Sequence, residues 1–202
     1  RQRNNLLKQA KGRTSVDLET NLSIWNDQLV TAAEFIGDTR EQFITRFGPA
    51  VTDFYQQVAG RDDPVVLQLD AEWRHMGLAE ALLTSHSDEV RRGMTLVGPH
   101  RDDLLVLLNS LPSRSHASQG EQRSLALALR LATYLYIEEV SGDQPLVLLD
   151  DVFSELDETR ARRLVECLPN SQIVLTSATG TVPDGVNPTQ ILNINEGQIH
   201  GA

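Results

Sequence analysis

Pro145-Leu-Val-Leu-Leu-Asp150-Asp151 is the stretch that decides the fold of this 202-residue chain. Four apolar residues followed by two carboxylates predict a strand that is buried on both sides and ends where it leaves the core. Ligands of open α/β sheets bind at the carboxyl ends of the strands. A carboxylate there can hold Mg²⁺, and a second one can polarise an attacking water. The plain structural alternative is that Asp150 caps the following turn and Asp151 is a surface residue.

The segments around this stretch alternate between helix and strand. Short strands are expected at residues 94–97, 104–108 and 173–175, the last two buried, with helices at residues 119–138 and 158–167. A final hairpin is expected at residues 191–199, around Asn195-Glu196-Gly197. This alternation predicts a largely parallel α/β sheet in the second half of the chain.

The first 60 residues read as helical. Ser15 can cap a helix with apolar residues at spacings of three and four, and Gly37-Asp38 is expected to interrupt it, which predicts an αα-hairpin. A strand at Val65 to Leu69 and a helix at residues 76–92 follow. We therefore expect a helical arm or lid domain over residues 1–93 and an α/β domain over residues 94–202.

Composition narrows the class of protein. The formal net charge of −10 argues against broad, passive binding to DNA, which depends on Lys and Arg at phosphates, but leaves room for a local basic patch. No apolar run approaches the roughly 20 residues that span a membrane, so no membrane contact is expected.

The single cysteine, Cys167, agrees with a reducing cytoplasm. The chain starts at Arg1 within a helical pattern, so we expect a fragment or a processed product.

Two further motifs flank the carboxylates. Val152-Phe-Ser154-Glu-Leu-Asp157 follows them and matches the D-loop that comes after the Walker B strand in ABC-type ATPases. Ser118-Gln119-Gly120-Glu121 precedes them and has the spacing of a capping box, which by itself is a common helix start. A helix start presents free amides and a positive dipole end to an anion such as phosphate. Its order along the chain is that of the ABC signature motif, whose usual form is Leu-Ser-Gly-Gly-Gln.

Three strings together resemble the RecF family of ABC-type ATPases. These are Gly98-Pro-His-Arg-Asp-Asp-Leu104, Ser118-Gln-Gly-Glu-Gln-Arg-Ser-Leu-Ala-Leu-Ala-Leu129 and Leu148-Leu-Asp-Asp-Val-Phe-Ser-Glu-Leu-Asp157. The opening Gln2-Arg-Asn-Asn-Leu-Leu-Lys8 is also similar. The resemblance covers nearly the whole chain and implies the C-terminal half of an ABC-type ATPase sheet joined to an N-terminal helical arm.

The resemblance implies an ATP-dependent DNA-binding protein of recombinational repair, replication-fork maintenance and the SOS response, located in the cytoplasm. The family is expected to form a homodimer on ATP and Mg²⁺. It acts with RecO and RecR to load a recombinase at gapped DNA, at single-strand/double-strand junctions or on double-stranded DNA.

The resemblance also implies roles for individual residues. Asp150 would be the Mg²⁺ carboxylate, and Asp151 would take the catalytic-carboxylate position. His100 and Arg101 are candidates for a DNA, nucleotide or subunit contact, and the structural alternative is a turn held by an Arg–Asp pair to Asp102 or Asp103. The expected nucleotide-binding residues are Ser118, Gln119, Gly120, Glu121, Ser154, Asp157 and Ser177.

Two departures from the ABC pattern shape the expected activity. The chain has no G-x-x-x-x-G-K-S/T phosphate loop, so we expect it to be inactive alone and the intact protein to be a slow ATPase. Thr176 and Ser177 occupy the region where ABC ATPases place a histidine, and neither hydroxyl carries a proton as imidazole does. The alternatives are the half-site of another ABC or chromosome-maintenance-like ATPase, and a non-enzymatic interaction fragment.

Overall fold

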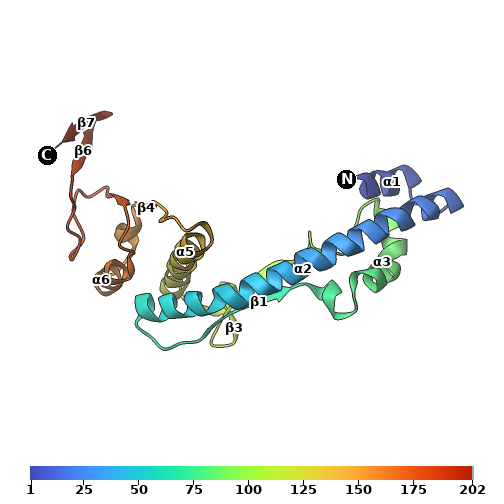
Figure 1. Cartoon of the computed structure of the whole chain (residues 1–202), viewed down its shortest axis with the longest axis horizontal. Helices are drawn as coiled ribbons and strands as arrows, with labels where there is room; N and C mark the ends of the chain where they lie inside the picture. Colours follow the sequence, from blue (N-terminus) through green and yellow to red (C-terminus); the bar gives the residue numbers. More distant parts are fainter. Residues whose placement is uncertain (202) are drawn as a thin grey trace. The chain divides into compact units, whose positions relative to one another are not determined.

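The computed structural model describes residues 1–201 (Figure 1). The chain divides into two compact units, each built from two segments of sequence. Residues 1–46 and 67–105 form the first unit, and residues 47–66 with the chain from Val106 onward form the second. The division falls inside one long helix, and the expected domain boundary between residues 93 and 94 stays a prediction.

The elements confirm a mixed α/β fold. Those that begin before residue 106 are α1 (Gln2–Ala10), α2 (Val16–Ala59), β1 (Val65–Asp70), the 3₁₀ turn η1 (Glu72–His75), α3 (Leu78–Arg92) and β2 (Asp103–Leu108). The later ones are β3 (Leu111–Pro112), α4 (Ser113–His116), α5 (Gln119–Ser141), β4 (Val147–Asp150), η2 (Val152–Glu155), α6 (Glu158–Cys167), β5 (Ile173–Thr176), β6 (Leu192–Asn195) and β7 (Gln198–Gly201). In residues 1–201, no helix is both long and apolar enough to cross a membrane.

The long helix α2 corrects the expected αα-hairpin. It runs without a break through Gly37, which is buried inside the first unit. A Cβ at residue 37 would lie 2.0 Å from Nη1 of Arg74, whose guanidinium also binds Asp38 and Glu41 at 2.8 Å each. Because Gly37 has no side chain, the Arg74 guanidinium can pack against the helix at this position. The glycine lowers helix stability by about 1 kcal/mol, which is not enough to end the helix.

The prediction of a strand at residues 94–97 is also wrong, because two of its backbone amides donate hydrogen bonds to side chains and not to a neighbouring strand. The amide of Thr95 donates to Oδ1 of Asn4 at 2.9 Å, and the amide of Leu96 donates to Oε1 of Glu89 at 2.7 Å. These bonds hold residues 94–97 as an irregular segment against α1 and α3, with no strand ladder.

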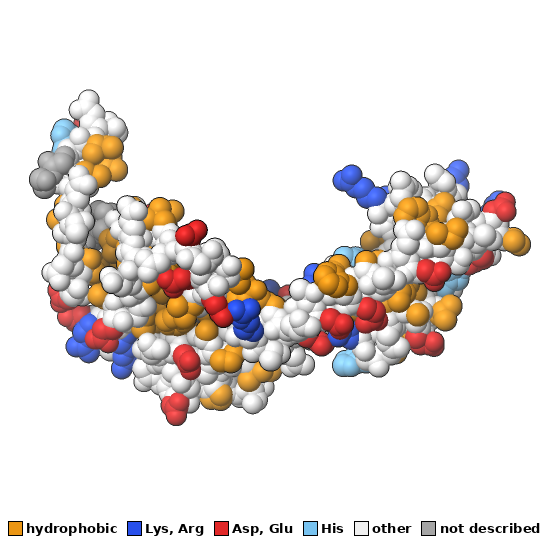
Figure 2. Space-filling view, in the orientation of Figure 1, with side chains coloured by type: hydrophobic (Ala, Val, Ile, Leu, Met, Phe, Trp, Pro, Cys, Tyr) orange, Lys and Arg blue, Asp and Glu red, His pale blue; other side chains and the backbone are white. Residues whose placement is uncertain are grey.

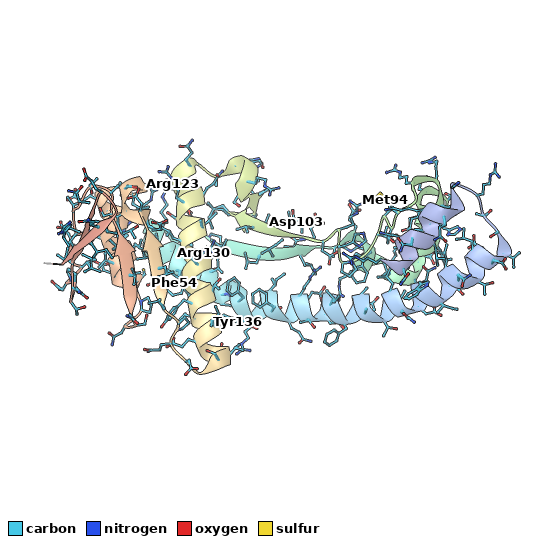
Figure 3. All side chains as sticks on the ribbon, turned by 90° about the horizontal axis from the view of Figure 1, so that it is seen from above. Phe54, Met94, Asp103, Arg123, Arg130 and Tyr136 are labelled. Carbon is cyan, nitrogen blue, oxygen red and sulfur yellow. The ribbon has the colours of Figure 1, made fainter. Side chains whose placement is uncertain are left out.

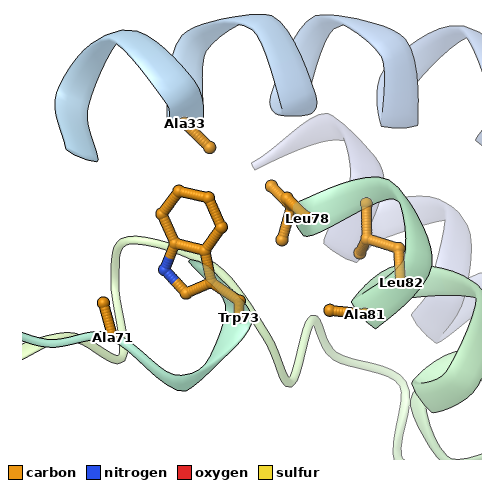
Figure 4. Close-up of a cluster of buried hydrophobic side chains, with 6 residues drawn as sticks. All are labelled: Ala33, Ala71, Trp73, Leu78, Ala81 and Leu82. Atoms are coloured by element: carbon orange, nitrogen blue, oxygen red, sulfur yellow. The ribbon is translucent and has the colours of Figure 1, made fainter. Parts of the chain in front are cut away.

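A buried polar network joins α1 to the rest of the first unit. The guanidinium of Arg3 forms an ion pair with Glu89, whose side chain is fully buried. Arg3 also donates to Oγ1 of Thr95 at 2.7 Å and to Oδ1 of Asn26 at 2.8 Å. An apolar cluster around Trp73 and Leu78 fills the space between α2, η1 and α3 (Figure 4).

In the second unit, the core lies where the end of α2 meets α5 and α6. Val58, Leu131 and Leu164 are its buried centre, and Phe54 packs against them (Figure 3). The parallel pair β4–β5 and the antiparallel hairpin β6–β7 complete this unit. The expected largely parallel sheet is therefore wrong for the described residues, since β2–β3 is antiparallel as well. The expected turn of that hairpin is confirmed at Glu196-Gly197, where both residues have positive φ.

The strands are less buried than their apolar sequences predict. Leu149 of β4 is buried, but Leu148 is 67% exposed and faces the same side as its register partner Val174. β2 likewise exposes Asp103 and Leu104. The expectation that these strands are buried on both faces is wrong for the chain as described, since each has one apolar face without a covering layer. Figure 2 shows similar surface apolar side chains over the β6–β7 hairpin.

The buried Arg3–Glu89 pair generates a stability prediction. Arg3→Leu leaves an uncompensated carboxylate in the core and should cost about 3–5 kcal/mol of unfolding free energy. Both tryptophans, Trp25 and Trp73, belong to the first unit, so urea unfolding followed by their fluorescence reports on it directly. The matched control is Arg91→Leu, which removes only an exposed pair with Asp88 and should cost less than about 1 kcal/mol. Equal urea midpoints for the two variants would contradict the conclusion that the Arg3–Glu89 pair stabilises the first unit.

Candidate functional site

Two carboxylates emerge together at the end of β4. Because β4 and β5 are parallel and in register at Asp150 and Thr176, both strands present their carboxyl ends at one edge. The hydroxyl of Thr176 donates to Oδ1 of Asp150 at 2.6 Å and accepts from the amide of Asp151 at 3.0 Å. One threonine thus fixes the Asp150 side chain and the turn that carries Asp151.

Asp151 is held in a conformation that few residues adopt. Its φ is 49°, in the left-handed region that is uncommon for a non-glycine residue. The hydroxyl of Ser154 donates to Oδ2 of Asp151 at 2.9 Å, and the amide of Ala178 donates to Oδ1 at 3.4 Å. The carboxylate is therefore anchored from the D-loop on one side and from the loop after β5 on the other.

A cavity of about 620 Å³ opens beside Asp151, the second of these carboxylates. Its polar lining includes Asp151, Ser154, Arg162, Thr176 and Ser177. The hydroxyl of Ser177 is 3.0 Å from that of Thr179 and does not reach either carboxylate through a hydrogen bond of the described residues. The structure therefore assigns the contact with Asp150 to Thr176, whereas Ser177 is a wall residue of the cavity.

Asp150 fits Mg²⁺, because its Oδ2 has no hydrogen-bond partner among residues 1–201. Mg²⁺ takes oxygen ligands, keeps several waters and is usually bound by one or two carboxylates together with substrate phosphates. Within residues 1–201, no cluster of three or more His, Cys, Asp or Glu side chains could hold a metal by itself. A cation at Asp150 would complete its shell with water or phosphate oxygens.

The signature residues form the capped start of α5. The amide and hydroxyl of Ser118 both donate to Oε2 of Glu121 at 2.8 Å, and the Glu121 amide donates back to Oγ of Ser118 at 3.4 Å. This is the predicted capping box at the start of a 23-residue helix. Bonds from Ser118, aided by the nearby Arg61 and Arg160 charges, lower the pKa of Glu121, so this carboxylate is ionised at neutral pH.

The D-loop lies directly beside this helix start. Asp157 caps α6 by accepting from the Arg160 amide at 2.9 Å, and its other oxygen binds Nη1 of Arg160 at 2.8 Å. The same guanidinium covers Gly120, where an added Cβ would lie 2.8 Å from Nη1. Arg123 of α5 donates to the carbonyl of Glu155 at 2.8 Å (Figure 3). Two arginines therefore connect the signature turn with the D-loop.

Comparison with known proteins places this arrangement in a family. A DNA replication and repair protein RecF from Citrifermentans bemidjiense is 35% identical over 96% of this chain and 57% of its own length. Proteins of the same name from Streptomyces avermitilis and Acidothermus cellulolyticus are each 37% identical, over 98% and 100% of this chain. The chain belongs to the RecF family.

Solved structures agree with this assignment. A structure described as the recombination mediator protein RecF with ATP in the RecFOR pathway matches the whole chain with a TM-score of 0.81 and 26% identity, covering 55% of that chain. This chain spans 57% of the length of the curated RecF relatives named above. No protein-family model matches the chain.

The RecF string at residues 98–104 belongs to the first unit, whereas the residues described above belong to the second. Asp102 accepts from Arg40 at 2.6 Å and from Nε1 of Trp73 at 2.7 Å, so an Arg–Asp pair does hold this turn, although its arginine is distant in sequence. His100 approaches the carbonyl of Thr95 at 3.2 Å, and the exposed Arg101 side chain has no hydrogen bond or ion pair in residues 1–201. A functional contact of His100 or Arg101 stays a prediction.

Sequence reasoning missed the arginines of the RecF site. Arg160 follows the N-cap Asp157 by three residues, a spacing that could have indicated their pairing. Arg61 binds Glu121 from 60 residues away, and no local pattern marks such a contact. Thr176 was considered with Ser177, but only the strand register identifies it as the partner of Asp150.

The lowered pKa of Glu121 generates a pH prediction. A carboxylate with a depressed folded-state pKa stabilises the fold above its ordinary value of 4.5, and this contribution is lost as pH falls through the folded-state pKa. Unfolding followed by far-UV circular dichroism should therefore show a stability difference between Glu121→Gln and the parent chain at pH 7 that shrinks below pH 4.5. A difference that does not vary with pH would contradict this role.

Proposed function

We propose that this chain is the Walker B, D-loop and signature part of a RecF protein that dimerises on ATP and acts in DNA repair. The supporting observation is the pair of carboxylates at the end of β4, fixed by Thr176 and Ser154 beside an open cavity. This is the arrangement that phosphoryl transfer needs, because its catalysis consists mostly of positioning and charge stabilisation.

Each carboxylate has a distinct role in this proposal. Asp150 keeps one oxygen without a protein partner among the described residues and would bind Mg²⁺, which neutralises phosphate charge when bound. Asp151 is oriented from both sides and would accept charge from the attacking water. Thr176 and Ser177 stand where related ATPases use a histidine, which favours slow hydrolysis suited to a switch.

The position of the signature turn favours action on a second subunit. None of residues 118–121 lines the cavity beside Asp151. Ser118 and Gln119 are exposed at the capped start of α5, where amides and the helix dipole can receive a phosphate. The turn would therefore contact ATP held by the partner of a homodimer.

The cellular role follows from the family. The related structures are described as members of the RecFOR pathway, and the relatives as DNA replication and repair proteins. We propose that the intact protein binds DNA at gaps or junctions and works with RecO and RecR to load a recombinase. The proposal also includes a part in the SOS response and a cytoplasmic location, where bacterial DNA lies.

The carboxylates are tested separately in the intact protein. Asp150→Asn should weaken Mg²⁺-dependent ATP binding. Asp151→Asn should leave binding nearly unchanged and slow hydrolysis by about 10²-fold or more, because an amide cannot accept charge from water. Titration with ATP and steady-state hydrolysis separate the two effects. Parental hydrolysis by both variants would remove these residues from the site.

The signature turn is tested by a pair of substitutions at Ser118 in the intact protein. Ser118→Ala and Ser118→Arg both remove the cap and should cost a similar stability of about 1 kcal/mol. Only Ser118→Arg also blocks the turn, so it should abolish ATP-dependent dimerisation while monomers still bind ATP. Sedimentation with a slowly hydrolysed ATP analogue measures this. If the two variants dimerise equally, Ser118 is only a cap. Gly120 is less suitable because any side chain there also displaces Arg160.

A further inference from the structure

A negative charge stands at the turn that would receive phosphate. Glu121 is in the first turn of α5, three residues after the N-cap Ser118. Its side chain is 20% exposed, and Oε2 is occupied by the amide and hydroxyl of Ser118. A carboxylate there satisfies the helix start, but it repels a second anion that approaches the same amides.

Arg61 supplies the opposite charge. Nη1 of Arg61 is 2.9 Å from Oε1 of Glu121, the oxygen that Ser118 does not use. Arg160 is a second cation nearby, but its Nη1 already binds Asp157 at 2.8 Å. The four side chains thus form two pairs, Arg61 with Glu121 and Arg160 with Asp157. Removing Arg61 alone leaves the turn with an unbalanced carboxylate.

The backbone that carries Arg61 is fixed by other contacts. Gly60 ends α2 with a φ of 64°, and its amide donates to the Gln56 carbonyl at 2.8 Å. Arg163 of α6 donates to the Ala59 carbonyl at 3.0 Å and covers Gly60, where a Cβ would overlap its guanidinium. The end of α2 is thus held against α6, so the backbone of Arg61 has a defined position from which its side chain reaches Glu121.

We propose that Arg61 is a positioning residue for ATP-dependent dimerisation, because its ion pair with Glu121 cancels the carboxylate charge at the phosphate-facing start of α5. The inference rests on the proposed function of the signature turn. Arg61 acts through Glu121 and need not touch the nucleotide. The end of α2 thereby becomes part of the dimerisation surface, and its displacement would weaken closure on ATP.

A double-substitution cycle in the intact protein tests this inference. Arg61→Ala should weaken dimerisation on a slowly hydrolysed ATP analogue about tenfold, because it leaves a negative charge facing phosphate. Glu121→Gln retains a capping side chain without charge, and its own dimerisation sets the reference level for the double variant. Arg61→Ala combined with Glu121→Gln should dimerise as well as Glu121→Gln alone, so the loss caused by Arg61→Ala should disappear. Arg61→Lys keeps the charge and should remain close to the parent.

Arg130→Ala is the matched control (Figure 3). It removes the same charge from an exposed residue of α5 whose side chain has no hydrogen bond or ion pair in residues 1–201. It should leave dimerisation unchanged. The inference is overturned if Arg61→Ala dimerises like the parent, or if Glu121→Gln fails to rescue it. If one of these two results is obtained while Ser118→Arg still abolishes dimerisation, only the role of Arg61 fails. Dimerisation by Ser118→Arg would instead overturn the proposed role of the signature turn, on which this inference rests.

Discussion

The bond from the Thr176 hydroxyl to the Asp150 carboxylate is the contact on which the carboxyl edge of β4 and β5 depends. It exists only because β4 and β5 are parallel and in register, so that the last residues of both strands stand side by side. The same hydroxyl accepts from the Asp151 amide and thereby supports the left-handed turn into the D-loop. A slip of one residue would turn Thr176 to the opposite face and break its bonds to the Asp150 carboxylate and to the Asp151 amide.

A second constraint operates between helices. Arg160 can bind Asp157 and cover Gly120 at once only because residue 120 has no side chain. The glycine of the signature turn therefore has a structural reason within one subunit, in addition to any approach by phosphate. Arg123 adds a bond to the Glu155 carbonyl, so the start of α5 and the D-loop are joined at two points.

The sequence was informative where motifs are local and silent where contacts are distant. The capping box, the bounds of α6 and the turn at Glu196-Gly197 each depend on a few neighbouring residues, and each was predicted correctly. The helix break predicted at Gly37 was wrong, because the prediction used neighbouring residues only. The contact of Gly37 with Arg74 is created by tertiary packing. The strand expected at residues 94–97 failed for the same reason, since its amides bond to Asn4 and Glu89 from other elements. Roles in nucleotide binding remain predictions from motif and family.

The charge of the chain is consistent with the proposed phosphate contact, which would be made by amides and paired side chains. With a formal net charge of −10, the chain does not attract phosphate as a whole. A phosphate-facing turn in such a protein needs donors whose effect is local, and the free amides of a helix start meet this need. Those amides require a cap, and a carboxylate cap brings a charge of the wrong sign. In the proposed dimer, Arg61 would resolve this conflict, because its ion pair neutralises Glu121 without using the amides of the helix start.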